Sequence, residues 1–268
     1  STGCSTDSIL EMIDIDNFID HFAFEVLTAR SDNAANLRYF RPRHPSGKWR
    51  WITYDMDLWS DHNENTLGRL LDPNDIHEYS VYGLLMRDPT IRVLFINRCA
   101  DLLNTSFAPE ITIPVLKQLE SSLHDEIERD RARWSNEMKN DPDVLERMML
   151  HLEGRPSIMI GHISKEFKTS PTEFRLVIGD GGSVNCNSIN LDHSRPLTYF
   201  QGHSIRLEAT PDPGFDFCGW SGSFNTDEAV INVDPAELKR IRAEFKRSSS
   251  GRNGLQDRLE ERSTIDIP

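Results

Sequence analysis

Cysteine is scarce in this chain, and it has neither an excess of positive charge nor any long hydrophobic run. Four cysteines occur in 268 residues, with no CxxC pair, so a structural zinc site is not expected. The formal charge is −13 and the pI about 5.1, which argues against nucleic acid as the main partner. No stretch approaches the roughly 18 apolar residues of a membrane-spanning helix, so no membrane span is expected.

The common short catalytic motifs are missing as well. The sequence contains no GxGxxG, P-loop, GxSxG or HExxH pattern, which removes the usual signals for dinucleotide, Walker-type, serine-hydrolase and zinc-protease chemistry. The start, Ser1 to Cys4, has neither the charged beginning nor the apolar core of a signal peptide. Because the first residue is not Met, we expect a mature or excised fragment.

Hydrophobic periodicity predicts an α+β protein with two domains and a tail. Domain 1–170 is expected to be mainly helical, domain 171–247 to be a small all-β module, and 248–268 to be a flexible polar tail. In the first domain a helix is expected to end near Ala29, a β-hairpin over 37–57, and a loop over 60–75. Further helices are predicted in the ranges 78–88, 89–103, 114–138, 143–151 and 156–167.

The β module poses two questions that the residues alone leave open. Cys186 and Cys218 both fall in it, and are either a disulfide or two buried thiols. Closing a loop of about 30 residues would stabilise so small a core by roughly 3–4 kcal/mol. Trp220 either stacks on a sugar or fills the module's core, the second being the more common use of a tryptophan.

Four oxygen-bearing side chains flank the predicted hairpin. Asp32 and Asn36 precede it, and Asp55 and Asp57 end it. A hairpin brings its two ends together, and converging carboxylate and amide oxygens suit Mg²⁺. Protein kinases use the same order of parts: a catalytic-loop Asp, an Asn a few residues later, and a metal-binding Asp after the next strand.

Each of these residues also has an ordinary structural explanation. Asp32 and Asn36 are typical turn or capping residues. Asp55 and Asp57 are spaced to lie on one face of a strand, where two carboxylates repel unless a cation or proton lies between them; their alternative is a solvated strand end.

Several separated segments, in order, resemble the CotH kinase family, atypical protein kinases first known from bacterial spore coats. The resemblance covers about residues 10–168. It is carried by the segments 16–27, 31–33, 36–40, 48–57, 84–92, 95–98 and Arg155-Pro156.

The resemblance implies a kinase-like C-terminal lobe that uses Mg²⁺ and ATP to phosphorylate protein Ser/Thr hydroxyls. Asp32 matches the family's catalytic-loop aspartate. Asn36, Asp55 and Asp57 match its metal-binding groups, Asp55 standing where other kinases have the aspartate of their metal-binding motif. The family's N-terminal lobe, with a nucleotide-clamping lysine, precedes this region, and most of that lobe is not present in this sequence.

In the β module the segments 182–184, 202–209, 213–217 and 219–222 resemble small repeat modules of bacterial surface and secreted proteins. This resemblance implies an extracytoplasmic location. Two functions are therefore considered. The first is a CotH-like Mg-ATP-dependent protein kinase, and the alternative is a catalytically inactive kinase-like surface or adhesion protein with a β spacer. The acceptor protein and the oligomeric state are left open.

Overall fold

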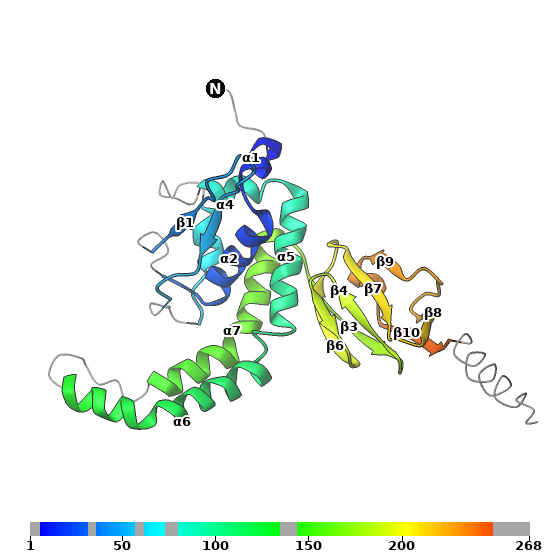
Figure 1. Cartoon of the computed structure of the whole chain (residues 1–268). Coiled ribbons are helices and arrows are strands. Elements are labelled where there is room, and N and C mark those ends of the chain that lie inside the picture. The colour runs from blue at the N-terminus through cyan, green and yellow to red at the C-terminus, as the bar shows by residue number, and fades with distance from the viewer. Residues whose placement is uncertain (1–5, 32–35, 57–61, 73–79, 135–143, 249–268) are drawn as a thin grey trace, which may run out of the picture. The chain divides into compact units, whose positions relative to one another are not determined.

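The computed structural model describes residues 6–31, 36–56, 62–72, 80–134 and 144–248. The chain divides into two compact units, Ser1–Pro171 and Thr172–Pro268. The described part of the first unit is mainly helical and that of the second consists mainly of β-strands (Figure 1), so the predicted α+β class is confirmed. The predicted flexible tail, apart from Ser248, lies outside the described residues.

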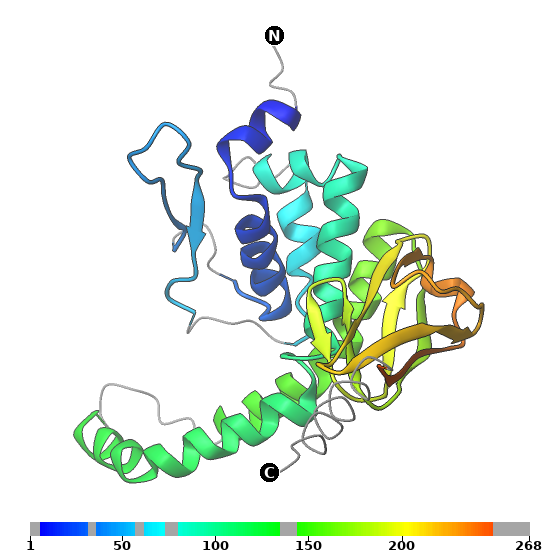
Figure 2. The same cartoon turned by 45° about the vertical axis from the view of Figure 1, so that its right-hand side comes forward.

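Helix α2 (Ile15–Leu27) is the centre of the first unit. Asp14 caps it by accepting a hydrogen bond from the Asn17 N–H at 3.2 Å. Its Phe18 and Phe22 are completely buried, and Phe22 stacks on Phe95 of α5 with ring centroids 4.4 Å apart. Figure 2 shows α2 between the hairpin on one side and the other helices on the other. The helix is therefore the scaffold on which the hairpin rests.

The other helices of this unit correct the predicted boundaries in two places. The segment expected to be a loop over 60–75 contains a helix, whose Leu67 and Leu70 are buried. The helix expected to start at Pro114 begins at Pro109. The helices are α1 (Thr6–Met12), α3 (Thr66–Leu71), α4 (Ser80–Leu85), α5 (Pro89–Leu103), α6 (Pro109–Trp134) and α7 (Val144–Phe167).

Helix α7 is a larger correction, because two helices were predicted where one continuous helix runs through Pro156. An internal proline costs a helix on the order of 3 kcal/mol. Here the neighbouring Arg155 is held by four backbone carbonyls, and Met159 and Ile163 are completely buried. Tertiary contacts on both sides of the proline thus outweigh its local effect.

The predicted hairpin is present as strands β1 (Arg38–Phe40) and β2 (Arg50–Ile52). They pair antiparallel with Tyr39 opposite Trp51. Trp51 packs edge-on against Phe18 of α2, at a centroid distance of 5.0 Å, so one face of the hairpin lies on the helix.

Over residues 171–248, which the structure describes, the strands form two four-stranded sheets, with strand orders β6-β3-β10-β8 and β5-β4-β7-β9. Within these sheets β3 and β10 run parallel. Buried Phe174, Leu207 and Ile241 belong to the core of the second unit. The strands are β3 (Pro171–Ile178), β4 (Gly182–Cys186), β5 (Ile189–Leu191), β6 (Arg195–Phe200), β7 (Ile205–Pro211), β8 (Phe215–Gly222), β9 (Val230–Val233) and β10 (Arg240–Arg247).

The possible disulfide between Cys186 and Cys218 is not formed. Cys186 is buried in β4, with its Sγ 3.2 Å from the Tyr199 hydroxyl, whereas Cys218 is exposed in β8 of the other sheet. The alternative of two buried thiols is therefore wrong for Cys218. Trp220 is 2% exposed and its indole N–H donates to the Glu228 carbonyl at 3.0 Å, so it fills the core and has no face for a sugar.

Candidate functional site

The site begins at the C-terminus of α2, where the chain turns back on itself. Ala29 adopts a left-handed conformation with φ 55°. Its N–H donates to the Val26 carbonyl, and the Arg30 N–H donates to the Glu25 carbonyl, which is the Schellman arrangement for ending a helix. This turn directs the Arg30 side chain back toward Glu25.

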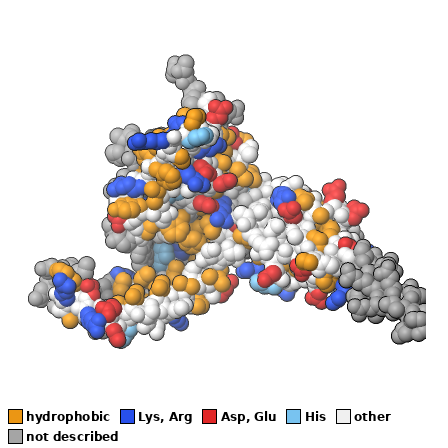
Figure 3. Space-filling model, in the orientation of Figure 1, with side chains coloured by type: hydrophobic (Ala, Val, Ile, Leu, Met, Phe, Trp, Pro, Cys, Tyr) orange, Lys and Arg blue, Asp and Glu red, His pale blue; other side chains and the backbone are white. Residues whose placement is uncertain are grey.

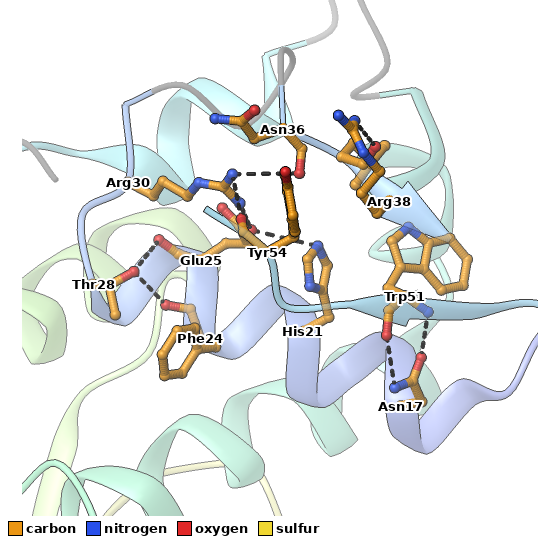
Figure 4. A network of polar contacts seen from close by, with 11 residues as sticks. Asn17, His21, Phe24, Glu25, Thr28, Arg30, Asn36, Arg38, Trp51 and Tyr54 are labelled. Carbon is orange, nitrogen blue, oxygen red and sulfur yellow. Dashed lines mark hydrogen bonds and ion pairs between the residues drawn. The ribbon is translucent and has the colours of Figure 1, made fainter. Parts of the chain in front are cut away.

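The Arg30 guanidinium joins the two ends of the hairpin (Figure 4). It donates to the backbone carbonyl of Asn36 at 3.4 Å and to that of Tyr54 at 2.9 Å. On its inner side it donates to Glu25 Oε1 at 2.5 Å. Arg30 thereby holds the backbone at Asn36 and the backbone next to Asp55, the residue after Tyr54.

Arg30 forms a buried ion pair with Glu25. The side chains of Arg30 and Glu25 are each 1% exposed, and a buried pair of this kind depends on both partners, because either charge alone would be left uncompensated. His21 lies 3.5 Å from the same Glu25 oxygen. Burial and the Arg30 cation lower the pKa of His21 to about 4, so the imidazole is neutral at neutral pH and Arg30 supplies the positive charge of the pair.

The opposite end of the hairpin is fixed to the start of α2. The Asn17 side chain accepts from the Trp51 N–H at 2.6 Å and donates to the Trp51 carbonyl at 3.2 Å. Asp14 pairs with Arg50 at 2.9 Å. The helix therefore holds the hairpin at both of its own ends.

Of the four predicted site residues, the structure describes two, and Arg30 holds the backbone segments that carry them. Asn36 is half-buried, and Asp55 is exposed with φ 54°. Left-handed backbone is uncommon outside glycine but tolerated by aspartate, and such conformations occur often at functional sites. The Asp55 carboxylate forms no hydrogen bond or ion pair with a described residue. Asp32 and Asp57 lie outside the described residues.

Met56, the residue after Asp55, lies in an apolar environment. Met56 is half-buried and lines an apolar cavity of about 210 Å³ together with Phe24, Leu27 and Phe107. An exposed carboxylate is thus followed by an apolar side chain that anchors the backbone next to Asp55.

The available donors fit Mg²⁺ in chemical type. Asp55 offers carboxylate oxygens and Asn36 an amide oxygen, and hard oxygen ligands of this kind are the ones that Mg²⁺ prefers. Among the described residues no three His, Cys, Asp or Glu side chains are grouped as a metal site.

Arg155 of α7 connects this region to the rest of the unit. Its guanidinium donates to the carbonyls of Val26 and Leu27 at the end of α2, and to those of His62 and Glu64 before α3. Burial lowers its pKa to about 10, so it stays charged at neutral pH. Arg155 therefore helps to end α2 at the position where the Arg30 turn begins.

Comparison with known families identifies both units. Residues 4–159, more than half of the chain, match the family model described as CotH kinase protein. The chain belongs to the CotH kinase family. Residues 178–249 match the divergent InlB B-repeat domain. No curated protein and no solved structure was found to match. The chain is thus a kinase-like protein of the CotH family with a β-repeat module.

The sequence indicates candidate oxygen donors in this CotH family member but not the groups that support them. Glu25 and Arg155 entered only as parts of segments that resemble the family, and Arg30 was given no role. One signal was available for Glu25, a charged residue beside the apolar Phe22 and Val26 of the first predicted helix. Arg30 gives no such signal, because its carbonyl partners are set by the tertiary fold.

None of the described helices is both long and apolar enough to cross a membrane.

Proposed function

We propose that this protein catalyses Mg²⁺-dependent transfer of the ATP γ-phosphate to Ser or Thr hydroxyls of another protein. The observation that carries the proposal is the single Arg30 guanidinium bound to the carbonyls of Asn36 and Tyr54. It fixes the backbone beside an amide and beside a carboxylate that occur in the order used by kinases. Membership of the CotH kinase family supports the same chemistry.

The proposed roles follow from the chemistry of each side chain. Asp55, Asp57 and Asn36 would hold Mg²⁺ through their oxygens. The bound cation would neutralise charge on the phosphates. Asp32 would orient the acceptor hydroxyl and accept its proton. Phosphoryl transfer needs mainly positioning and charge stabilisation, which suits a carboxylate segment held by a buried ion pair.

The metal role is tested by titrating Mg-ATP into the chain by calorimetry, for the wild type and for Asp55→Asn. Asparagine adopts left-handed backbone about as readily as aspartate, so this substitution removes the charge without imposing a new backbone strain. We expect at least about tenfold weaker Mg-ATP binding. Unchanged affinity would refute the metal role of Asp55.

The base role is tested separately with Asp32→Asn. Mg-ATP affinity should stay close to that of the wild type, while the rate of phosphoryl transfer to a protein acceptor falls on the order of 10²-fold. A parallel loss of affinity and rate would instead make Asp32 a metal-binding or structural group.

The match to the divergent InlB B-repeat domain favours a second candidate. In it the chain is a surface or adhesion protein whose kinase-like unit is inactive, with the β module as a spacer outside the cytoplasm. The exposed Asp55 carboxylate opposes it, because a structural role gives no reason to keep an unpaired charge in a left-handed conformation. Absence of Mg²⁺-dependent nucleotide binding in the wild type would favour this candidate.

A further inference from the structure

The hairpin between Asn36 and Asp55 carries concentrated positive charge in an acidic chain. Residues 37–54 contain five Lys or Arg side chains and no Asp or Glu, whereas the whole chain has a formal charge of −13. Of the five, Arg50 is paired with Asp14. The other four are exposed and pair with no described carboxylate: Arg38, Arg41, Arg43 and Lys48.

The same hairpin has an uncovered apolar face. Arg38 lies opposite Ile52, and Phe40 opposite Arg50, so these residues share the strand face opposite to that of Trp51, which packs on Phe18 of α2. Phe40 is 45% exposed, Ile52 43% and Tyr54 47%, and the Arg38 guanidinium lies 5.0 Å from the Tyr54 ring centroid. In Figure 3, Lys or Arg and hydrophobic side chains are interspersed on the part of the first unit where Figure 1 places the hairpin.

Such a surface calls for an anionic partner. Cations gathered without counter-charges repel one another, and complementary charge on a partner relieves that repulsion and speeds the encounter. Exposed apolar side chains among the cations add contact area for apolar groups. The chemistry that matches both is a polypeptide segment in which acidic and apolar residues are mixed.

We propose that this surface, the basic hairpin face (Arg38, Phe40, Arg41, Arg43, Lys48, Ile52 and Tyr54), docks an acidic segment of the protein acceptor. The inference rests on the proposed function, and it names the acceptor class. Carboxylates of the segment lie against Arg41, Arg43 and Lys48, and its apolar side chains lie on Phe40 and Ile52. Because the hairpin starts just after Asn36 and ends just before Asp55, an acceptor held there lies beside the Asp55 carboxylate.

Overall charge favours a short acidic segment over a nucleic acid. A long polyanion would extend beyond the hairpin and meet the field of a chain that is strongly negative overall. A segment of a few residues meets only the local cations. Aliphatic side chains also suit Phe40 and Ile52, whereas a nucleic acid would offer only its bases.

The test measures binding without catalysis. A fluorescein-labelled peptide containing a serine flanked by Glu and Leu is titrated with the full chain, and anisotropy is recorded in the absence of nucleotide. The wild type should bind this peptide, and the affinity should weaken as salt rises from about 50 to about 300 mM. The same peptide with Gln in place of Glu should bind at least about tenfold more weakly.

Paired charge reversals locate the binding. Arg41→Glu with Arg43→Glu should weaken binding of the acidic peptide at least about tenfold. The control, Arg240→Glu with Arg242→Glu, makes the same change in net charge at exposed positions of β10 and should change affinity less than about twofold. Arg41→Gln with Arg43→Gln serves if the reversal does not fold, since Gln keeps an N–H for the Gly47 carbonyl that Arg41 binds.

Each other result overturns the inference. Equal binding of the acidic and neutral peptides, equal losses in the two reversed variants, or no binding at all would refute docking at the hairpin. Tighter binding of an oligothymidylate than of the acidic peptide would assign the face to nucleic acid. Binding of the acidic peptide at the hairpin without any transfer from Mg-ATP would refute the proposed function and leave the docking surface in place.

Discussion

Arg30 is a single side chain on which the alignment of the site depends. Replacing it with Met removes the bonds to Asn36 and Tyr54 and breaks the buried ion pair with Glu25. We expect the free energy of unfolding of the first unit to fall by about 3–5 kcal/mol, the usual cost of breaking a buried pair. Urea denaturation followed by circular dichroism measures this loss.

The double variant Glu25→Leu, Arg30→Met separates stability from site geometry. With both charges removed, much of the stability should return, because apolar replacement of a buried pair is often neutral. Mg-ATP binding should stay weak, because the carbonyls of Asn36 and Tyr54 still lack their common donor. Recovery of binding together with stability would mean that Arg30 has no positioning role.

His21 gives the molecule a stability that depends on pH. Its pKa is lowered to about 4 in the folded chain, whereas an unperturbed histidine titrates near 6.5. Between these values the unfolded chain binds a proton that the folded chain does not. The free energy of unfolding should therefore fall as pH is lowered from about 6.5 to about 4, by at most about 3 kcal/mol.

The His21→Leu variant should lose this part of the pH dependence in urea titrations at several pH values. The control His44→Gln, at an exposed turn position, should follow the wild type. An identical pH slope for His21→Leu and the wild type would show that other groups set the dependence.

At this scale the sequence indicates candidate oxygen donors, whose metal role stays a prediction, but not the residues that support them. Asn36 and Asp55 were identified as candidates because oxygen-bearing side chains around a hairpin form a recognisable order along the chain. Arg30 was not, because its partner at Tyr54 lies 24 residues away and a bond to a backbone carbonyl places no constraint on the type of the partner residue.

Helix α2 is the element that positions the site, and Arg155 of α7 secures its end. The Arg155 guanidinium donates hydrogen bonds to carbonyls of two separate segments. Lysine has a single side-chain nitrogen and cannot reproduce this set of hydrogen bonds.

Arg155→Lys should lower the midpoint of thermal unfolding of the first unit by several degrees, since the cost is about 3 kcal/mol or more. The exposed Arg129→Lys on α6, 74% exposed in an ion pair with Glu126, should leave the midpoint unchanged. Equal midpoints for the two variants would contradict the anchoring role.

Element boundaries were predicted well where periodicity was strong and poorly where tertiary contacts intervene. The end of α2 near Ala29 follows from its apolar pattern. The break expected before Pro156 did not occur, because local propensity gives no weight to the contacts of Arg155, Met159 and Ile163. Helix α3 was missed within the loop expected over 60–75, because its few buried leucines lie among many polar residues of that segment.

At the scale of the whole molecule, we expect each unit to fold without the other. The two units have separate apolar cores, and Thr169-Ser170-Pro171 has the composition of a linker. Fragments 1–170 and 171–249 should each unfold cooperatively, the first with a helical and the second with a β-type circular dichroism spectrum. Non-cooperative unfolding of both fragments would mean that they share one core.

The hydrogen bonds between Asn17 and Trp51 also determine how much the sequence of the hairpin turn can vary. Most hairpins take their register from the turn that joins their strands, but here a side-chain amide on a neighbouring helix binds both the N–H and the carbonyl of one strand residue. The turn over residues 42–47 is therefore not needed to set the register of the two strands. Its length and charge can change through insertions or grafted loops while Asp55 keeps its position, so the turn can be re-engineered without rebuilding the end of the hairpin that carries Asp55.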